Sequence, residues 1–321
     1  MIDRDIIDRF RRDVETLAAG EPPRLGIALS GGPDSLALLL LAATAWRGRI
    51  AAATVDHALR ECSAAEARLA AAACARLGVP HLTLRLEWPE TPEANLQAVA
   101  REARYFALER WAAGSAIPVL ATAHHMDDQA ETLVMRLARG AGLSGLASIR
   151  PVAERGAGLT LIRPLLGWRR AELSALVGAS GIEAADDPSN RDPRFDRTAA
   201  RALLADTRWL APERLAAASA NLGEAEEALA WTADRFFEER ATRERGGAIA
   251  IDAAGLPREL QRRLLARAVA SLSGGDPPPG PKLARLLDAL RSGRTATLSG
   301  LRASPGPPWC LASAPPRRAR R

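Results

Sequence analysis

Acidic residues lie one helical turn apart in the stretch AHHMDDQAE, residues 123–131. On a helix that starts near His125, Glu131 is three residues beyond Asp128 and four beyond Asp127, so each pair shares a face. Carboxylates on one face can hold a positively charged amine while charge develops on a nearby phosphate. For Asp127, a helix N-terminus that favours negative charge is the simpler explanation. The spacing predicts a site that handles an amine and a phosphate.

A histidine pair precedes these acids, and His124 falls at the end of an apolar stretch, aimed at the same crevice. Its imidazole is capable of carrying a positive charge. A metal site is the alternative, but HHxDD lacks the spacing of zinc peptidases and no third nitrogen or sulfur ligand is evident. The three cysteines, Cys62, Cys74 and Cys310, are far apart and form no CxxC. We expect no structural zinc, no disulfide framework and no iron–sulfur cluster.

A second candidate site is SGGPDS, residues 30–35, at the end of the apolar stretch RLGIALS. Its two glycines let the backbone turn sharply and approach a ligand without a Cβ in the way. Its serines offer hydroxyl donors, and a helix that begins near Asp34 points its amides at an anion. The patterns GxxxxGK[ST] and GxGxxG are both absent. The stretch predicts a phosphate cradle in which Asp34 holds a magnesium ion; an ordinary N-capped turn is the weaker alternative.

Both motifs are expected at strand ends of one parallel sheet. In the first half of the chain, short apolar stretches that end in polar residues alternate with Ala/Leu-rich helical stretches. The apolar stretches are RLGIALS (24–30), RIAAATVDH (49–57), PHLTLRLE (80–87) and PVLATAHH (118–125). Such alternation predicts a parallel sheet with helices on both faces. Ligands of these folds sit beyond the carboxyl ends of the strands, where every polar motif falls.

The chain, at 321 residues, is long enough for two domains. We expect an α/β, Rossmann-like parallel-sheet domain over residues 1–210 and a helical linker over 211–245. A glycine pair then opens a smaller, mainly helical α+β domain over 246–321, with helices near 257–273 and 280–291 and short strands. The tail PPRRARR is interpreted as a flexible basic end.

The composition is that of a soluble globular protein, with 47% hydrophobic and 26% charged residues. No apolar run reaches the length of a membrane span, and the charged start is unlike a secretory signal, so we expect a cytoplasmic protein without a membrane partner. The net charge of +6 fits a polyanionic partner, but all basic residues except Lys282 are arginine, which indicates a composition bias. Charge alone leaves nucleic-acid binding open.

The stretch SGGPDS resembles the pyrophosphate loop of the N-type ATP pyrophosphatases, whose signature is SGGxDS. Enzymes of this PP-loop superfamily cleave ATP between the α and β phosphates, transfer AMP to an oxygen of the substrate and release pyrophosphate. The resemblance implies ATP as a substrate, with Mg²⁺. It also implies an ATP-binding set of Ser30, Gly31, Gly32, Pro33, Asp34, Ser35, His124 and Arg201.

Further stretches resemble the family of tRNA(Ile)-lysidine synthetases. These are VDHALR (55–60), ATAHHMDDQAETLVMRLARGAGLSGL (121–146), IRPLL (162–166) and DDPSNRDPRFDRTAAR (186–201). The family joins free L-lysine to carbon 2 of the wobble cytidine of isoleucine tRNA with a CAU anticodon, which changes codon reading from AUG to AUA. The resemblance implies an adenylated tRNA intermediate and a tRNA-binding C-terminal domain, and it leaves room for a homodimer.

The resemblance also implies roles for single residues. His124 would contact the nucleotide, and Asp128 and Glu131 would bind the ammonium groups of lysine. Arg104 would help to place the lysine near the reaction centre. The implied catalytic set is Asp34, His124, Asp128, Glu131 and Arg197.

The arginines after the DPSN loop are expected to reach the ATP phosphates or the RNA. Members of the family often carry Arg-Asn where this chain has Arg197-Thr198, so the choice between Arg197 and Arg201 as the phosphate contact stays open. Asp187 and Asn190 are interpreted as loop organisers, because Asx side chains cap their own backbone.

Two alternatives of different kinds remain at the level of sequence. One is a tRNA 2-thiolase of the same superfamily; such enzymes commonly need a cysteine pair or a cluster, and the chain has no CxxC. The other is a non-catalytic nucleotide-binding module, for which the acids of residues 123–131 would have no use. Pyrophosphate release that depends on both tRNA and lysine would separate all three.

An RNA substrate predicts a steep salt dependence of binding, because arginines that contact phosphates release counterions. We expect the dissociation constant for tRNA to rise strongly between low and physiological salt in a filter-binding or fluorescence titration. A flat dependence would argue against an RNA substrate.

Overall fold

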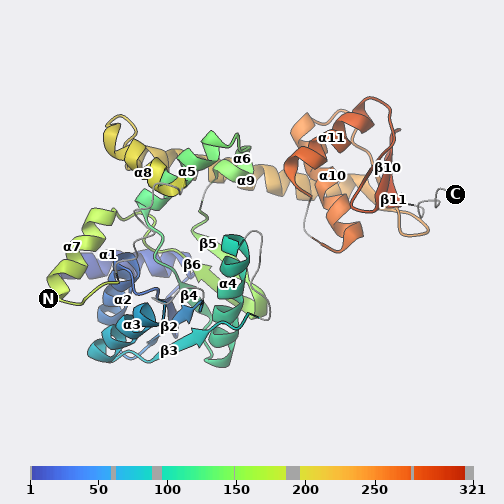
Figure 1. Ribbon diagram of the computed structural model, residues 1–321. Helices are drawn as coiled ribbons and strands as arrows, with labels where there is room; N and C mark the ends of the chain where they lie inside the picture. Colours follow the sequence, from blue (N-terminus) through green and yellow to red (C-terminus); the bar gives the residue numbers. More distant parts are fainter. Residues whose placement is uncertain are drawn as a thin grey trace. The chain divides into compact units, whose positions relative to one another are not determined.

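The computed structural model describes residues 2–58, 63–88, 96–147, 149–185, 196–275 and 278–314. These residues form two compact units, residues 1–223 and 224–321 (Figure 1). The 29-residue helix α9 (Pro212–Arg240) contributes to both units. The division falls inside the segment that the sequence predicts as a linker.

The first unit is built on a six-stranded sheet with the order β3-β2-β1-β4-β6-β5. Its strands are β1 (Leu25–Ala28), β2 (Ile50–Asp56), β3 (His81–Arg85), β4 (Val119–Ala121), β5 (Val152–Arg155) and β6 (Leu159–Ile162). All neighbours pair in parallel except β5, which runs antiparallel to β6 at the edge. The four strands predicted from the sequence are confirmed. The β5–β6 hairpin is an addition to that prediction.

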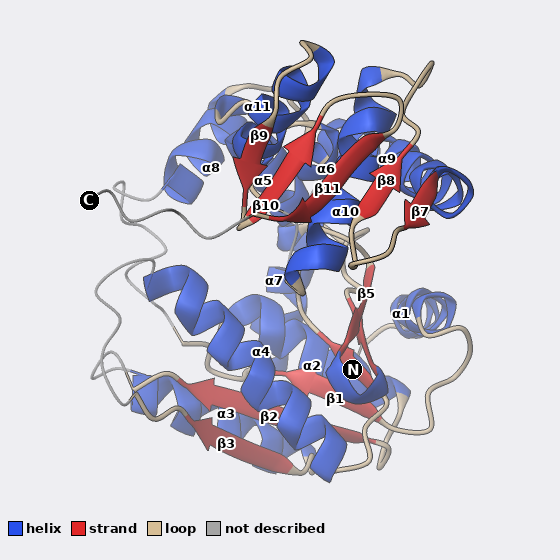
Figure 2. Ribbon diagram, turned by 90° about the vertical axis from the view of Figure 1, so that its right-hand side faces the viewer, coloured by secondary structure: helices blue, strands red, loops and turns tan. Residues whose placement is uncertain are grey.

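Helices cover both faces of this sheet. On one face lie α1 (Arg4–Leu17), α2 (Pro33–Ala45), α3 (Ser63–Leu77) and α7 (Arg170–Ser180), and on the other lies α4 (Leu96–Gly114) (Figure 2). The alternation along β2 shows how the sequence divides the faces, since Ile50 and Ala52 pack with α2 while Ala51 and Ala53 pack with α4.

Helix α2, which carries the loop SGGPDS at its start, is the most deeply buried helix of the unit. Residues 35–42 are all buried, as expected of a helix that is apolar all round. Phe10 of α1 packs edge-on against Trp46 just after α2, with ring centroids 5.7 Å apart, and against Trp168 just before α7 at 6.5 Å. The core therefore fixes the position of the loop.

The remaining helices of the first unit are α5 (Met126–Ala138), α6 (Leu143–Leu146), α8 (Asp196–Asp206), the first part of α9 and the short 3₁₀ helix at Gly156–Gly158. The second unit holds an antiparallel sheet in the order β7-β8-β11-β10-β9. Its elements after α9 are β7 (Ala241–Arg243), β8 (Ile249–Ile251), α10 (Arg258–Ser273), α11 (Gly280–Arg291), β9 (Ala296–Leu298), β10 (Leu301–Ser304) and β11 (Trp309–Ser313).

The second unit buries its own core between α10, α11 and the sheet, centred on Leu264, Leu287 and Leu311. A smaller α+β unit after the parallel sheet matches the fold class predicted from the sequence. Among the helices of the described ranges, none combines the length and the apolar character that crossing a membrane requires.

Candidate active site

The loop between β1 and α2 has a backbone that only glycine suits at one point. Gly31 adopts φ +84°, and a Cβ there would lie 3.0 Å from the carbonyl oxygen of Glu66. The hydroxyls of Ser30 and Ser35 lie 3.0 Å apart, and Ser35 Oγ donates to the carbonyl oxygen of Gly32 at 3.0 Å. Gly32 is the N-cap of α2 and supplies no side chain to cap the helix amides. The helix N-terminus is therefore suited to an anion.

A cavity of about 350 Å³ opens beside this loop, a volume within the range of small-molecule sites. It lies beyond the carboxyl ends of β1, β2 and β4, where parallel sheets bind their ligands. Residues that line it include Ser30, Asp34, Ser35, Thr54, His57, Arg101, Arg104, Tyr105, Thr122, His124, Asp128 and Arg197. Seven of the residues singled out in the sequence thus meet at one cavity: Ser30, Asp34, Ser35, Arg104, His124, Asp128 and Arg197.

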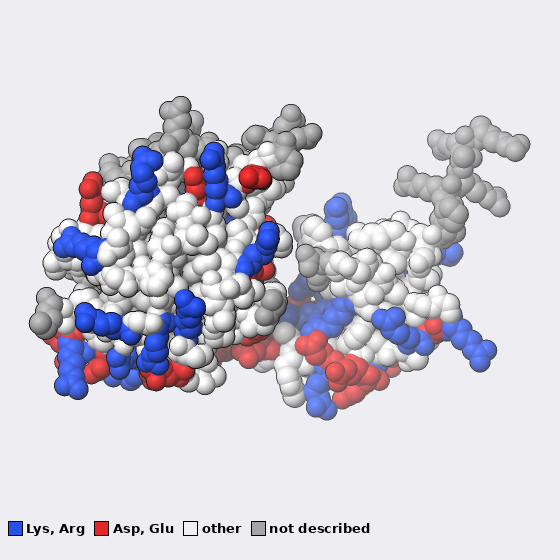
Figure 3. Space-filling view, turned by 90° about the horizontal axis from the view of Figure 1, so that it is seen from below, with Lys and Arg blue, Asp and Glu red and all other residues white. Residues whose placement is uncertain are grey.

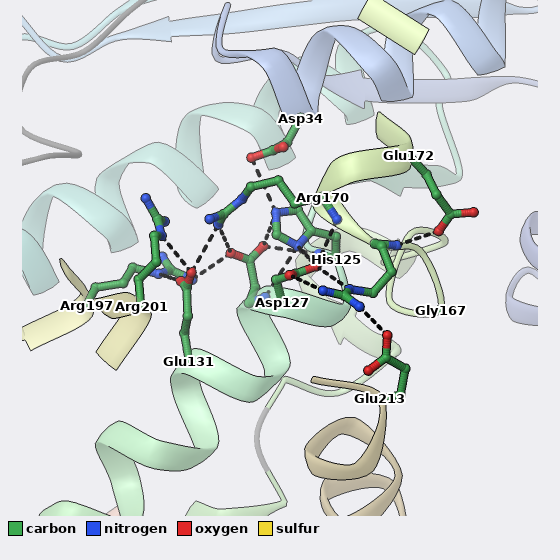
Figure 4. A network of polar contacts seen from close by, with 12 residues as sticks. Asp34, His125, Asp127, Glu131, Gly167, Arg170, Glu172, Arg197, Arg201 and Glu213 are labelled. Carbon is green, nitrogen blue, oxygen red and sulfur yellow. Dashed lines mark hydrogen bonds and ion pairs between the residues drawn. The ribbon is translucent and has the colours of Figure 1, made fainter. Parts of the chain in front are cut away.

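His125 ties α5 to the loop. It is the N-cap of α5: its Nδ1 accepts from the backbone N–H of Asp128 at 3.3 Å, and Asp128 Oδ2 accepts from the N–H of His125 at 3.1 Å. The ring is fully buried, with Nε2 3.4 Å from Asp34 Oδ2 and 3.6 Å from Asp128 Oδ2 (Figure 4). His125 thus links the acid of the loop to the acid of the helix.

The sequence alone indicates no role for His125, because a pair of adjacent histidines does not show which ring points into the protein. Its place before the helical acids, where an N-cap belongs, was the available signal.

Glu131 lies at the centre of an ion-pair network and is only 1% exposed. Its Oε1 accepts from Arg170 at 3.1 Å and from Arg201 Nε at 2.9 Å, and its Oε2 accepts from Arg197 Nε at 2.8 Å (Figure 4). Arg197 also donates to Asp128 Oδ1 at 3.0 Å. Glu131 and Arg201 belong to this network and not to the lining of the cavity.

Burial works to raise the pKa of Glu131, but the hydrogen bond from Arg201 and the charges of Arg170 and Arg197 hold it below its usual value. Asp128 behaves differently. Its burial raises the pKa above the usual value, although His125 and Arg197 act in the opposite direction. The two acids therefore differ: Glu131 is a firmly ionised anchor, and Asp128 is the one that can take up a proton most easily.

From the sequence, we expect Arg197 and Arg201 to reach the ATP phosphates or the RNA. In this structure both donate to carboxylates of α5, and Arg170, which the sequence analysis did not single out, joins them. The neighbouring Arg169 pairs with Asp127 at 3.2 Å, which gives Asp127 a structural role at the N-terminus of α5. Asp187 and Asn190 lie outside the described residues.

His124 faces the cavity and its Nδ1 lies 3.0 Å from Thr122 Oγ1. Burial lowers the pKa of His124 to about 3, and the charges of Arg163, Arg101, Arg197 and Arg104 act in the same direction. Its imidazole is therefore neutral at physiological pH. The cation that the sequence analysis allowed at this position comes instead from the arginines around it.

Asp34 suits a magnesium ion that also binds phosphate. Its Oδ1 is buried and has no hydrogen-bond partner among the described residues. Burial works to raise the pKa of Asp34, but His125, Arg170 and Arg201 hold it below the usual value, so the carboxylate is ionised. Mg²⁺ is commonly held by one or two carboxylates together with phosphates and waters. Within the described ranges no three His, Cys, Asp or Glu side chains gather into a metal site, so the phosphates would have to supply ligands.

This loop, its cavity and the sheet define a nucleotide-binding PP-loop enzyme fold, and the PP-loop domain model matches residues 7–207. The chain is 45% identical to a tRNA(Ile)-lysidine synthase of Novosphingobium aromaticivorans over 98% of this chain and 95% of that protein. It is 41% identical to one of Zymomonas mobilis over 92% and 90%. The chain belongs to the tRNA(Ile)-lysidine synthase family.

A solved U34-tRNA thiolase of Methanococcus maripaludis, with its [4Fe-4S] cluster, shares the fold. Its TM-score is 0.57 over 68% of this chain and 79% of that chain, with 17% sequence identity. At this identity the likeness extends to the fold alone.

The environment of His124 predicts a ring that does not titrate near neutrality. A histidine in an unfolded chain titrates near pH 6.5, whereas His124 has a pKa of about 3. Its ring signals in an NMR titration should stay constant from about pH 8 to pH 5, and His124→Gln assigns them by their disappearance. The contribution of His124 to the free energy of unfolding is fully present above pH 6.5. It is lost as the pH falls toward 3, because over that range the histidine binds a proton in the unfolded chain and not in the folded one. A titration midpoint of the His124 ring near pH 6.5 would contradict the lowered pKa.

Proposed function

We propose that this chain ligates lysine to carbon 2 of the wobble cytidine of isoleucine tRNA with a CAU anticodon, by way of an adenylated tRNA. The observation that carries the proposal is that the buried carboxylate of Asp128, which Arg197 bridges to Glu131, lines the same cavity as the phosphate-binding loop. A nucleotide-binding module has no use for Asp128 and Glu131 beside its phosphates. A ligase that handles an ammonium group does.

The first step is adenylation of the cytidine. The loop of residues 30–35 and the amides at the start of α2 hold the β and γ phosphates as the leaving group. The cytosine carbonyl oxygen attacks the α phosphorus, the bond to the β-phosphate oxygen breaks, and pyrophosphate leaves. Mg²⁺, when bound at Asp34, offsets the charge that develops on the phosphate oxygens. His124 contacts the nucleotide as a neutral ring.

The second step is attack of the lysine amine on carbon 2 of the ring, with AMP as the leaving group. The amine must lose its proton to attack, and Asp128, which faces the cavity with a raised pKa, is placed to accept it. Arg104, also on the cavity wall, suits the carboxylate of lysine. Glu131 and Asp128 hold the ammonium charge.

Lysine binding requires an exchange of partners. The carboxylates of Glu131 and Asp128 are now paired with Arg170, Arg197 and Arg201. A buried carboxylate cannot be left unpaired without a large cost. Arg197 and Arg201 are therefore free to turn to phosphates only as the ammonium group takes their place. This exchange reconciles the phosphate role expected for these arginines with the contacts observed here.

The RNA must present an unstacked cytidine to the cavity, as is usual for chemistry on a base. We propose that residues 246–321 bind the body of the tRNA and that the reaction takes place in the cytoplasm with free L-lysine. A homodimer is compatible with this scheme.

Cys62 lies outside the described residues, and the two cysteines that the structure describes do not favour a thiolase. Cys74 is fully buried in the core, and burial raises the pKa of its thiol to about 12. Cys310 lies on β11 of the second unit. Neither is among the residues that line the cavity beside the loop.

The product tests the proposal. The protein is incubated with tRNA, ATP and lysine, and the nucleosides are examined by mass spectrometry. We expect cytidine to gain the mass of lysine less water, with pyrophosphate release over many turnovers that needs both tRNA and lysine. Asp34→Ala should release no pyrophosphate, since the leaving group loses its metal anchor. Sulfur in the product nucleoside in place of lysine would replace this function with that of a thiolase.

Glu131→Gln is expected to separate the two steps. The ammonium group loses a buried partner, which typically costs about 3–5 kcal/mol and raises the lysine requirement by orders of magnitude. Adenylation should largely persist. With labelled ATP, AMP attached to RNA should accumulate and convert slowly when lysine is added.

Glu154→Gln, at an exposed position on β5, is the matched control and should behave as the parent. If Glu131→Gln abolishes adenylation while lysine binding stays normal, Glu131 serves the nucleotide and the division of roles is wrong.

A further inference from the structure

Four arginines surround the single tyrosine of the chain. The guanidinium carbons of Arg155, Arg101 and Arg104 lie 4.3, 5.1 and 5.7 Å from the ring centroid of Tyr105. Arg101 Nη2 donates to the Tyr105 hydroxyl at 3.4 Å, and the side chain of Arg163 interacts electrostatically with that of Tyr105. The ring is 4% exposed, so it is a fixed support for the cations. We call Arg101, Arg104, Arg155 and Arg163 the arginine cluster.

The positive charge of the arginine cluster is mostly uncompensated. Arg155 pairs with Glu109 at 3.2 Å. For Arg101, Arg104 and Arg163, the described part of the chain offers no carboxylate within ion-pair distance. Arg163 is 7% exposed, and its buried Nε has no hydrogen-bond partner there. Burial lowers the pKa of Arg163, and the charges of Arg101 and Arg155 also lower it. Cations that repel one another around a buried guanidinium would be stabilised by an anion.

The cluster meets the active-site cavity at its rim. Arg101, Arg104 and Tyr105 line the wall that α4 forms, whereas Ser30, Asp34 and Ser35 form the wall of the phosphate loop. Arg101 is also exposed to solvent, which places its guanidinium between the cavity and the outside. An anion can therefore reach Arg101 from the solvent.

A nucleotide whose base is flipped into the cavity would place an anion at this rim. When its base enters a cavity, the phosphates on either side stay at the opening, because the backbone continues to the rest of the RNA. The pyrophosphate of ATP is already provided for by the loop and the start of α2. On the face shown in Figure 3, basic and acidic side chains are interspersed and form no continuous basic patch.

We propose that Arg101 binds a backbone phosphate next to the target cytidine. Tyr105 holds the guanidinium of Arg101 in place, and Arg155 and Arg163 strengthen the local positive potential. Arg101 is thus a substrate-binding residue at the mouth of the site. This inference rests on the proposed function, since it requires an RNA nucleotide in the cavity.

The first test compares two arginines of the same helix. Arg110 is exposed and follows Arg101 by nine residues, half a turn away on an α-helix, so it points to the opposite side of α4. We expect Arg101→Ala to raise the dissociation constant for tRNA about tenfold and to lower the slope of its salt dependence by about 0.9. Arg110→Ala should match the parent, and Arg101→Lys should recover part of the affinity. Equal effects of the two alanine variants would overturn the proposal.

The second test locates the phosphate. tRNA is prepared with one neutral methylphosphonate linkage, on the 5′ or the 3′ side of the target cytidine. One of these should weaken binding to the parent about as much as Arg101→Ala does, and should have little further effect on that variant. Fully additive losses at both linkages would mean that Arg101 contacts neither phosphate.

Another anion in the reaction is the carboxylate of lysine. If Arg101 binds it, Arg101→Ala raises KM for lysine but not for cadaverine, which lacks the carboxylate, and leaves tRNA affinity unchanged; that outcome overturns the proposal. Lysidine formation by the parent protein is measured on the same tRNA. Its absence would refute the proposed function, whereas its presence together with a normal Arg101→Ala variant would refute the phosphate contact alone.

Discussion

A buried carboxylate that cannot be left unpaired governs the arrangement of this site. Glu131 has almost no contact with solvent, so arginines must meet it. They come from two segments far along the chain, Arg170 at the start of α7 and Arg197 and Arg201 on α8. The first halves of α7 and α8 are thereby held against α5. This contact lies at the carboxyl ends of the strands, where the phosphate loop also lies.

The local parts of this arrangement could be predicted from the sequence. The glycines and serines of residues 30–35 predict a phosphate-binding loop because their contacts involve mainly residues of the loop itself. The turn at Gly31 needs the backbone conformation that glycine allows. The strands β1 to β4 were found because each lies in a short apolar stretch that ends in polar residues and is separated from the next by a helical stretch. Family membership and fold class are both confirmed, since they rest on these local patterns.

The parts that depend on distant contacts could not be predicted. The β5–β6 hairpin was missed because Glu154, Arg155 and the glycines of the connecting turn interrupt its apolar residues. Arg170 sits in an ordinary helix start, and only the fold brings it to Glu131, 39 residues earlier. The neutral state of His124 depends on burial and on arginines of α4, of α8 and of the residue that follows β6. No spacing in the sequence indicates that four arginines share one tyrosine.

The position of His125 has a thermodynamic consequence. One buried ring lies beside both Asp34, for which we propose a role at the nucleotide, and Asp128, for which we propose a role at the amine. A ligand that shifts either carboxylate alters the surroundings of the other, so occupancy of the two halves of the site is linked. Such linkage is reciprocal: any factor by which ATP strengthens the binding of lysine is the factor by which lysine strengthens the binding of ATP. Cooperativity between two chemically unlike substrates thus has a physical basis in one imidazole, without a second subunit.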